Sequence, residues 1–491
     1  MNLTVEVGYA ENKIARSMKD GKPQEWDTVR LRSFNGGLVG PVIEACPGDT
    51  LNILLKNRLP PEHSHGEHDP NVPHGFNSTN LHFHGLHVSP SGNSDNVLLT
   101  IGPGQEFQYE VKIPSDHPAG TYWYHAHRHG SVALQLASGM AGALIIRGDI
   151  DKVPAIHGAR EQLFVLQHLH YVLNADGIGE VESYDNFGPG RWEQLRRRTT
   201  VNGEVEPTVR MKPGEVQRWR FIHGGIRERI RLKLVRRDPK TGAETPLPQY
   251  QIALDGITTG RIEQVLETEM HPGYRADVMV RACDEQGQPL PVGTYWLVDE
   301  AVTPQDQEDQ GRVLARIVVE GHEVTMKLPT EKELAPLAPF KPIEDDELTS
   351  HEPQQVHFHI DTTKTPPEFQ INGKAFDPHD PPRKLALGAV EEWLVSASEI
   401  VGHPFHIHVN PFQVMGENGK VVWKDTIFVP AGGSVRLRTR YERYIGTFVI
   451  HCHILDHEDQ GMMQLLEVVP PDPAHDHASV PDEHGGHRAL H

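Results

Sequence analysis

The sequence predicts an all-β protein built from three Greek-key β-sandwich units. At 491 residues the chain is too long for one ordinary core, and roughly 100–200 residues per domain gives about three domains. Glycine (45) and proline (39) are plentiful while helical patterns are few, which favours short strands joined by turns. The third observation is a segment that occurs three times.

Each copy of this segment has a strand, an Asn-Gly turn and a Gly-containing turn that leads into another strand. The copies read FNGGLVGPVIEACPGDTLNILL, VNGEVEPTVRMKPGEVQRWRF and INGKAFDPHDPPRKLALGAVEEWLV. Their anchors Asn35, Asn202 and Asn372 lie roughly 170 residues apart, which is a domain-sized period. This spacing predicts the triplication of one β-unit.

Period-two alternation of apolar and polar residues marks strands within each unit. It is clear in TLNILLKN, EVQRWRFI and SVRLRTRY, and each run reads as a strand with one buried face. Greek-key sandwiches follow from such strands. The N-terminal MNLTVEVGYAENK also alternates like a strand and lacks the pattern of a signal peptide.

Composition shifts divide the chain into three units and two connecting or terminal segments. We expect units at residues 1–148, 149–325 and 356–470, with a Pro- and Glu-rich linker at 326–355. The tail at 471–491 is polar, histidine-rich and punctuated by proline, so we expect it to be disordered.

The charge balance excludes some partners. Lys and Arg total 47 against 67 acidic residues, a net charge of -20, so the surface should repel nucleic acid and anionic membranes. The chain has no run of apolar residues long enough to span a bilayer. We therefore expect no nucleic-acid partner and no membrane span.

The chain has only three cysteines, Cys46, Cys283 and Cys452, which cannot form a disulfide framework. A bridge between Cys46 and Cys283 is conceivable, but two separate buried thiols are the interpretation that the sequence favours. Histidine is the unusual residue: the 32 histidines far exceed what packing needs, so some should be metal ligands.

Four histidine clusters stand out because their members recur at every second position. In a strand, residues i and i+2 point to the same face, so each H-x-H aims two imidazoles at one point. Isolated pairs such as His168/His170 and His357/His359 have no partner motif, and we interpret them as structural. The four clusters are HFHG (His82, His84), HAH (His125, His127), HPFHIH (His403, His406, His408) and HCHILDH (His451, Cys452, His453, His457).

The motif HCH predicts two metal sites back to back. Cys452 should point to the opposite side of its strand from His451 and His453. A cysteine thiolate is a soft ligand that suits copper, and two histidines, a cysteine and a weak axial methionine make a blue electron-transfer site. His403 and His457 are the available imidazoles. The available thioether is that of Met462, because the adjacent Met463 should face the other way in an extended segment.

These motifs resemble those of a known family. HFHG, WYHAH, HPFHIH and HCHILDHEDQGMM, in this order, closely resemble the copper signatures of three-domain multicopper oxidases, and the ending is similar to bacterial laccase, spore-coat oxidase and bilirubin oxidase members. The segment WKDTIFVPAGGSVRLR is also similar, so the resemblance extends from about Leu31 to Val469. It implies three cupredoxin-like domains, with a trinuclear copper cluster between the first and the third.

The resemblance implies four copper ions per chain, of types 1, 2 and 3. The middle domain would hold none and would be structural. The ligands carried over are His403, Cys452, His457 and axial Met462 for type 1; His82 and His406 for type 2; and His84, His125, His127, His408, His451 and His453 for the type-3 pair.

The resemblance also implies a catalytic cycle. A reductant gives single electrons to the type-1 copper, Cys452 and the adjacent histidines pass them on, and four electrons reduce O₂ to two waters. Glu458, next to His457, is our candidate for relaying protons, and Asp95 is a second carboxylate that could orient water at the type-2 copper. The alternative for either acid is an ordinary solvated carboxylate.

We therefore interpret the chain as a laccase-like oxidase of phenols or similar small reductants, with O₂ as acceptor. One alternative is a metallo-oxidase acting on Cu(I), Fe(II) or Mn(II); against a dedicated Cu(I) oxidase, the ten methionines are scattered. Another is a non-catalytic copper-binding or coat protein, but such proteins tend to lose ligands and here every ligand position is filled. A copper enzyme of this kind favours the periplasm or the exterior, without excluding the cytoplasm, and a monomer suffices.

Two histidine-rich segments lie outside the implied ligand set. One, at residues 63–74, carries His63, His65, His68 and His74; the other is the tail. They are either polar surface segments or sites of weak copper capture.

Overall fold

The structure is a computed structural model that describes residues 1–62, 69–183, 195–302, 312–398, 401–416 and 419–471. These residues form five β-sheets with a few short helices between them, so the prediction of an all-β protein is confirmed. His63, His65, His68 and almost all of the predicted tail lie outside the described residues.

The largest sheet crosses from the first predicted unit into the second. Its two halves meet where β10 pairs in parallel with β2. The strands in spatial order are β17 (Ile257–Val265), β16 (Gln249–Leu254), β19 (Arg275–Arg281), β13 (Val216–His223), β9 (Arg160–Leu173), β10 (Ile178–Glu180), β2 (Lys22–Phe34), β1 (Asn2–Lys19), β4 (Thr50–Asn57) and β6 (Glu106–Lys112), with β11 (Arg196–Val201) beside β9.

A smaller sheet completes each of the first two units. In the first unit its order is β3 (Ile43–Ala45), β8 (Ala141–Ile146), β7 (Gly120–His125) and β5 (His82–His84). In the second unit the order is β12 (Thr208–Met211), β21 (Val313–Val319), β20 (Gly293–Asp299), β14 (Ile230–Arg237) and β15 (Glu244–Leu247), with β18 (Thr268–Met270) beside β14.

The third unit has two sheets of its own. One has the order β23 (Glu368–Ile371), β22 (Gln354–Asp361), β25 (Val390–Ala397), β30 (Ser434–Arg440), β27 (Phe412–Met415) and β28 (Val421–Lys424). The other has β24 (Arg383–Ala386), β32 (Met463–Val469), β31 (Gly446–Cys452), β26 (His403–Ile407) and β29 (Thr426–Val429).

Helices are short and lie between the sheets. In the predicted linker, α4 and η3 contact β17. The helices are α1 (Val132–Ala137), η1 (Asp149–Lys152), α2 (Pro154–His157), α4 (Glu331–Leu334), η3 (Ala335–Leu337), η4 (Asp345–Glu347) and α5 (Leu455–Asp459).

The three Asn-Gly repeats have the same conformation. The asparagine φ is 54° at Asn35, Asn202 and Asn372, and the following glycine also has a positive φ. Such a turn suits Asn-Gly because these two residues tolerate left-handed backbone. Each asparagine Oδ1 accepts a backbone N–H from a neighbouring strand, and each Nδ2 donates to a carbonyl of that strand. The repeat therefore fixes equivalent strands in each unit.

The predicted strands are present, with one informative difference. Residues of β4 alternate between buried and half-buried, as the sequence predicted. In β13, however, all eight residues are buried. Trp219 packs into the core of the second unit while Ile222, on the opposite face, packs into the core of the first. Both faces of β13 are covered because the two units share a wall.

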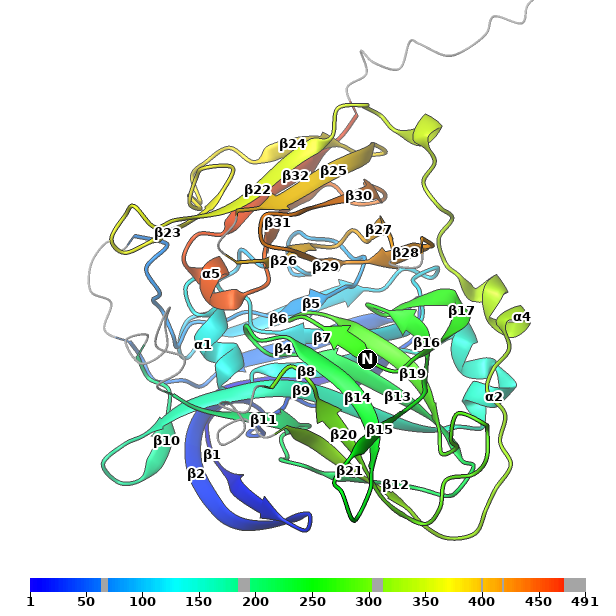
Figure 1. Cartoon of the computed structure of the whole chain (residues 1–491). Coiled ribbons are helices and arrows are strands. Elements are labelled where there is room, and N and C mark those ends of the chain that lie inside the picture. Colours follow the sequence, from blue (N-terminus) through cyan, green and yellow to red (C-terminus); the bar gives the residue numbers. More distant parts are fainter. Residues whose placement is uncertain (63–68, 184–194, 303–311, 399–400, 417–418, 472–491) are drawn as a thin grey trace, which may run out of the picture.

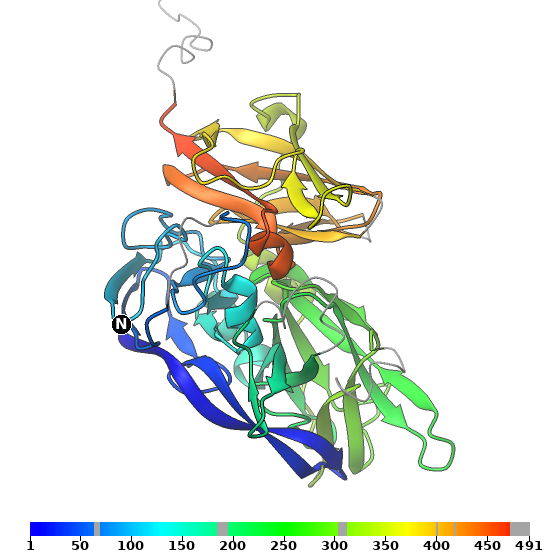
Figure 2. The same ribbon diagram turned by 90° about the vertical axis from the view of Figure 1, so that its left-hand side faces the viewer.

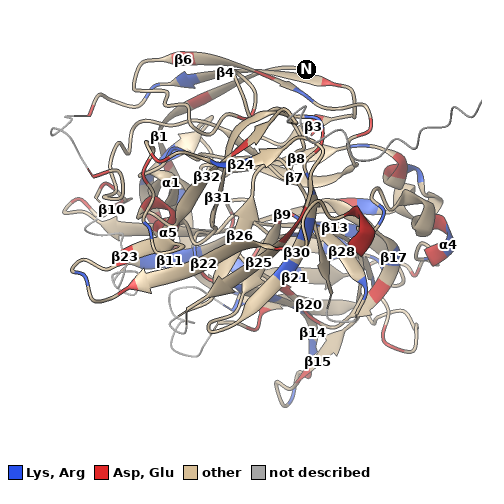
Figure 3. Cartoon of the chain, turned by 90° about the horizontal axis from the view of Figure 1, so that it is seen from above, with Lys and Arg blue, Asp and Glu red and all other residues tan. Residues whose placement is uncertain are grey.

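The third unit lies against the first two along a long interface. In Figure 1 it occupies the top of the molecule, and Figure 2 shows the first and second units side by side beneath it. Helices α5 and α1 meet at this interface. Three of the five residues of α5 are acidic, so much of this helix is red in the view from above (Figure 3).

Both cysteines outside the histidine clusters are free, as the sequence favours, and Cys283 is buried as expected. Cys46 is exposed because it follows the end of β3 at the surface, so the expectation that both thiols are buried is wrong for Cys46. Among the described residues, no helix has the length and apolar character needed to cross a bilayer.

Candidate metal centres

Two pairs of strands present the clustered histidines. In the first unit β5 pairs with β7, and His82 lies directly opposite His125. In the third unit β26 pairs with β31, and His406 lies opposite His451. Alternate residues of a strand share a face, so β5 directs both His82 and His84 to one side. In the other three motifs the second histidine lies just beyond the end of its strand: His127 after β7, His408 after β26 and His453 after β31. The two half-sites face each other across the interface between the units.

Eight imidazoles form a buried cage at this interface. Their exposed fractions do not exceed 2%. Across the interface His82 stacks on His408 with ring centroids 4.0 Å apart, and His84 stacks on His406 at 3.9 Å. The cage consists of the sequence-predicted type-2 and type-3 set: His82, His84, His125, His127, His406, His408, His451 and His453.

The cage nitrogens have the arrangement that a metal cluster requires. The Nε2 atoms of His127 and His408 lie 3.3 and 3.1 Å from Nε2 of His451. Within the described structure, several inward nitrogens have no hydrogen-bond partner, including His82 Nε2, His84 Nδ1 and His406 Nε2. A buried polar atom without a partner costs about 1–3 kcal/mol, so this cluster of free lone pairs fits bound metal ions.

Outward nitrogens of the same rings are held by the protein. Nδ1 of His82 lies 3.0 Å from Asp95 Oδ1, and Nε2 of His84 lies 3.0 Å from Asp425 Oδ1. Nδ1 of His406 donates to the backbone oxygen of Asp425 at 2.8 Å. A hydrogen bond at one nitrogen fixes the tautomer and leaves the other nitrogen as a ligand.

The second predicted centre lies in the third unit. Cys452 Sγ is 3.4 Å from His403 Nδ1 and 3.9 Å from His457 Nδ1, and the two Nδ1 atoms are 3.3 Å apart. The rings of Phe358 and Phe369 cover the two imidazoles, with centroids 5.2 and 4.8 Å away. A soft thiolate and two imidazoles in an apolar shell make a donor set that suits copper.

Met462 and Met463 diverge as the extended segment predicts. Met462 packs in the same buried cluster as Cys452, whereas Met463 packs in a different one with Val97 and Phe376. The Cys452 N–H donates to the Met462 carbonyl at 3.0 Å, which fixes Met462 beside the centre. The axial role of Met462 stays a prediction.

The two candidate acids are buried and adjoin the cage. Asp95 contacts His82 and also accepts the Phe83 N–H at 2.9 Å. Glu458 Oε2 lies 3.0 Å from His451 Nδ1, and Glu458 Oε1 lies 3.5 Å from His127 Nδ1. Neither acid is a solvated loop residue, because their exposed fractions are 2% and 0%.

Sequence reasoning missed three residues that support the cage. Asp425 and Arg275 are joined by a buried ion pair, and Asp459 accepts N–H groups from Gly130, Val132 and Ala133 in the first unit. Asp459 thus caps α1 from α5 across the interface. The only sequence signal was the position of Asp425 in WKDT and of Asp459 in HED; Arg275 had none.

The pairs set aside as structural are not part of a metal group. His168 and His170 are buried in β9, and His357 and His359 lie on β22. Among the described residues, all groups of three close metal-binding side chains belong to the two centres or to the Asp425 contact.

Comparison with known proteins decides the family. Two sequence profiles described as "Multicopper oxidase" match the chain, one at residues 17–150 and the other at residues 349–472. Together they carry all four histidine clusters. The chain belongs to the multicopper oxidases.

Individual members of the family align over most of this chain. A multicopper oxidase of Staphylococcus aureus is 26% identical over 452 residues, which is 89% of this chain and 83% of the other. A laccase of Haloferax volcanii is 26% identical over 498 residues, with 91% and 79% covered. The crystal structure of a multicopper oxidase from Campylobacter jejuni, described as a metallo-oxidase, superposes with a TM-score of 0.67 at 25% identity over 95% of this chain and 91% of that chain.

This multicopper oxidase is therefore an oxidoreductase that contains copper and uses O₂, and its domains are cupredoxin-like as expected. Assignment of each copper to named ligands follows the sequence prediction and stays a proposal. The donor atoms available are the inward nitrogens of the cage and the Cys452, His403 and His457 set.

Burial favours the uncharged form of several imidazoles in the two centres of this oxidase. It lowers the pKa of His125 to about 3 and that of His403 to about 4. Burial, followed by the repulsion of neighbouring imidazoles, also lowers the pKa of His82, His127 and His408 well below the usual value. A neutral imidazole offers the lone pair that a metal ion needs.

We expect acid to destabilise the copper-free enzyme from about pH 6.5 downward. The folded-state pKa values are lowered, so the unfolded chain binds protons that the folded chain does not, and stability present above about pH 6.5 is lost as the pH falls towards about 4. Urea unfolding midpoints across this range would measure the loss. Copper loading should make the unfolding midpoint depend less on pH. A pH-independent midpoint for the copper-free enzyme would contradict the prediction.

Met462→Leu should raise the reduction potential of the type-1 copper, because it removes a weak thioether donor and leaves an apolar side chain of similar size. A redox titration followed by the visible absorption of the copper–cysteine bond measures this. Met463→Leu is the matched control and should leave the potential unchanged. Equal potentials in the Met462 variant and the wild type would rule out the axial role.

Proposed function

We propose that this enzyme is laccase-like: it removes electrons one at a time from phenols or similar small reductants and passes them to O₂, which is reduced to two waters. The observation that carries the proposal is the adjacency of the two centres at the end of β31. Cys452 belongs to one centre, and His451 and His453 on either side of it belong to the other. The two centres are thus connected by a few covalent bonds.

Copper in the Cys452 centre would accept single electrons, and copper in the cage would collect them for O₂ reduction. The protein's contribution is to hold donors for both centres out of water. Cys452, His403, His457 and the cage histidines are all buried, and His457 is the most exposed of them at 3%. We infer that a reductant approaches the first centre on the His457 side.

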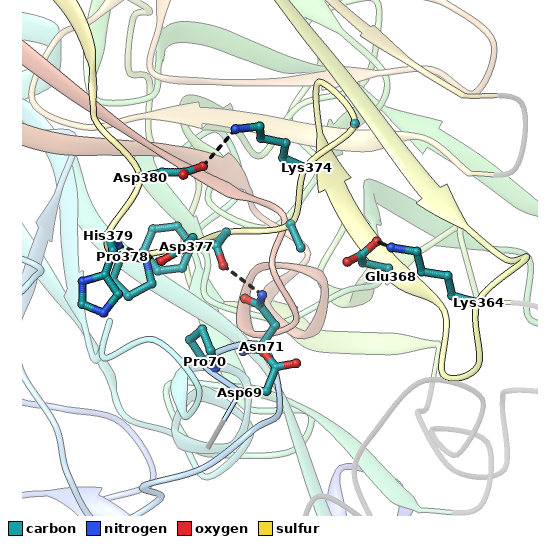
Figure 4. A pocket seen from close by; sticks show the side chains of 13 residues that line it. Asp69, Pro70, Asn71, Lys364, Glu368, Lys374, Asp377, Pro378, His379 and Asp380 are labelled. Carbon is teal, nitrogen blue, oxygen red and sulfur yellow. Dashed lines mark hydrogen bonds and ion pairs between the residues drawn. The ribbon is translucent and has the colours of Figure 1, made fainter. Parts of the chain in front are cut away.

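A surface pocket of about 700 Å³ adjoins this side (Figure 4). Asn71 on one wall donates to the Phe376 carbonyl at 2.9 Å, and the Phe376 N–H donates to the Gly461 carbonyl at 2.9 Å. Gly461 belongs to the turn between His457 and Met462. On the opposite wall Glu368 precedes Phe369, whose ring packs on His457. The walls of the pocket are thus linked to both segments that surround His457: one wall through hydrogen bonds to Gly461, and the other through the chain bond between Glu368 and Phe369.

The charges that line the pocket are partly neutralised. Lys364 pairs with Glu368, and Lys374 Nζ lies 3.4 Å from Asp380 Oδ2 (Figure 4). Paired charges attract a bare metal cation weakly, whereas a neutral phenol needs only hydrogen bonds and an apolar wall such as Phe376. This supports a small organic reductant.

A metallo-oxidase acting on Cu(I), Fe(II) or Mn(II) is the second candidate. Within the described part of the chain, two acids of the same pocket, Asp69 and Asp377, accept only backbone N–H groups, from Asn71 and from His379. Their remaining oxygens and the His379 imidazole offer donors to a cation. The related Campylobacter jejuni enzyme, described as a metallo-oxidase, adds weight to this candidate.

Oxygen uptake by the copper-loaded enzyme distinguishes the candidates. A dimethoxyphenol, Cu(I) and Fe(II) are compared in one buffer, with Cys452→Ser as the blank because it lacks the thiolate that would hold the electron-accepting copper. We expect the phenol to give the highest kcat/KM and the variant to be inactive. Faster turnover with a metal ion would favour the metallo-oxidase, and no uptake with any reductant would favour a non-catalytic copper protein.

We also propose that Glu458 relays protons to the cage. Its carboxyl group is fully buried within 3.0 Å of His451 and 3.5 Å of His127, and neither oxygen has a hydrogen-bond partner of ordinary geometry in the described structure. A buried carboxyl group that adjoins two proposed ligands and retains free lone pairs can hand protons inward. Asp95, by contrast, is occupied by His82 and by the Phe83 N–H, which supports an orienting role.

Glu458→Gln should slow O₂ reduction about 10²- to 10⁴-fold while leaving the visible copper–cysteine absorption intact, because an amide cannot transfer the proton. Stopped-flow reoxidation of the reduced enzyme by O₂ measures this step. Glu391→Gln, a buried glutamate of the same unit on β25, is the matched control. An unchanged reoxidation rate in Glu458→Gln would show that protons arrive by another route.

A further inference from the structure

The described residues of the middle unit contribute no side chain to either candidate metal centre, yet one of them contacts an aspartate beside the cage. Arg275 begins β19 and is 0% exposed. Its guanidinium lies beside Asp425, which stands between β28 and β29 in the third unit. This contact joins the middle unit to a residue that holds two cage histidines.

Every N–H of the guanidinium has an acceptor, and the acceptors come from all three units. Nη1 and Nη2 donate to Asp425 Oδ1 at 2.7 Å and Oδ2 at 2.5 Å, a bidentate pair with the third unit. Nε donates to the Thr121 carbonyl of β7 in the first unit at 3.3 Å. The remaining two N–H groups donate within the middle unit, to the carbonyls of Gly273 at 2.9 Å and Asp255 at 2.8 Å.

Asp425 passes this restraint on to the cage. Its Oδ1 lies 3.0 Å from His84 Nε2, and its backbone oxygen accepts the Nδ1–H of His406 at 2.8 Å. His84 belongs to the first unit and His406 to the third, and their rings stack at 3.9 Å. One aspartate therefore orients a stacked pair of imidazoles that come from different units.

The surroundings leave this arrangement little freedom. A Cβ added at Gly85, the residue after His84, would lie 2.3 Å from Arg275 Nη2 and 2.7 Å from Asp425 Oδ2. Gly85 also has a φ of +89°, which other residues adopt poorly. Asp255 accepts the Arg275 backbone N–H at 3.0 Å and lies 3.1 Å from Lys424 Nζ, so two acids and two bases balance each other.

We propose that Arg275 is a positioning residue for the copper cluster: it fixes Asp425, and through it His84 and His406, against all three units at once. The inference rests on the proposed ligand roles of these two histidines. It assigns the middle unit a part in holding copper although that unit supplies no ligand. A planar guanidinium suits this task because its five donors have fixed directions.

Arg275→Lys is the test, because lysine keeps the positive charge but cannot form the fork. The copper-loaded variant and wild type are incubated with a Cu(II) chelator. Copper loss is followed by metal analysis, the cluster by the type-2 electron paramagnetic resonance signal, and the Cys452 centre by its visible absorption. We expect the cluster to lose copper about 10- to 100-fold faster, as when other residues that orient ligands are removed, with the visible absorption retained.

Arg218→Lys is the matched control. Arg218 is also buried in the middle unit and also pairs with an aspartate, Asp277, through Nε at 3.1 Å and Nη2 at 2.6 Å. Asp277 in turn accepts from the Thr121 hydroxyl of the first unit but contacts no cage histidine. This variant should unfold at a lower temperature than wild type, yet lose cluster copper at the wild-type rate.

The proposal is overturned if the rate of copper loss from the cluster rises less than about tenfold in Arg275→Lys, or if it rises equally in Arg218→Lys. If Arg275→Lys has no visible absorption and so has not folded, Asp425→Asn is tested in its place, again against an increase of about tenfold in the rate of copper loss. If both Arg275→Lys and Asp425→Asn lack the visible absorption while Arg218→Lys retains it, the Arg275–Asp425 pair serves folding alone. A wild type without a type-2 signal would overturn the ligand assignment itself, whatever the reductant.

Discussion

The central constraint on this fold is that eight imidazoles must stay together in a buried interface between two sequence-distant units. Burial disfavours the charged form of an imidazole and so preserves its lone pair, but it also makes every unpartnered nitrogen costly. The protein meets both demands by fixing one nitrogen of several rings from outside. Asp95, Asp425 and backbone oxygens bind the outward nitrogens and leave the inward ones for metal. The strand pairing around the cage serves to hold these outer partners in place.

The sequence predicted the cage because its geometry is local. Two residues of one strand share a face whatever the rest of the chain does, so HFHG and HAH together predict one half-site before the fold is known. The same rule separated Cys452 from its neighbours and Met462 from Met463, and the two methionines do pack in different clusters. The repeats were predictable for a similar reason, since an Asn-Gly turn fixes its own backbone.

Residues that orient the cage could not be predicted, because each acts across an interface. Arg275 is 150 residues away from Asp425, and Asp459 is 326 residues away from Ala133. A single arginine in a strand or a single aspartate after a ligand has no periodic pattern that marks it. Their partners become visible only when the units are packed together. The fully buried β13 is another case: alternation implied one buried face, and the shared wall between two units covered the other.

The position of the middle unit follows from the same electrostatics. Asp425 can bind His84 strongly only as a carboxylate, and a carboxylate with 2% exposure is too costly to bury without a cation. Neither half-site supplies a cation that meets it with two matched donors: Lys424, next in sequence, faces Asp255 instead. Arg275 of the middle unit fills this place, and it brings hydrogen bonds to both other units with it. The proposed role of Arg275 thus explains why a unit whose described residues lie outside both metal centres packs at the point where the other two meet: the charge on Asp425 is balanced from outside both half-sites.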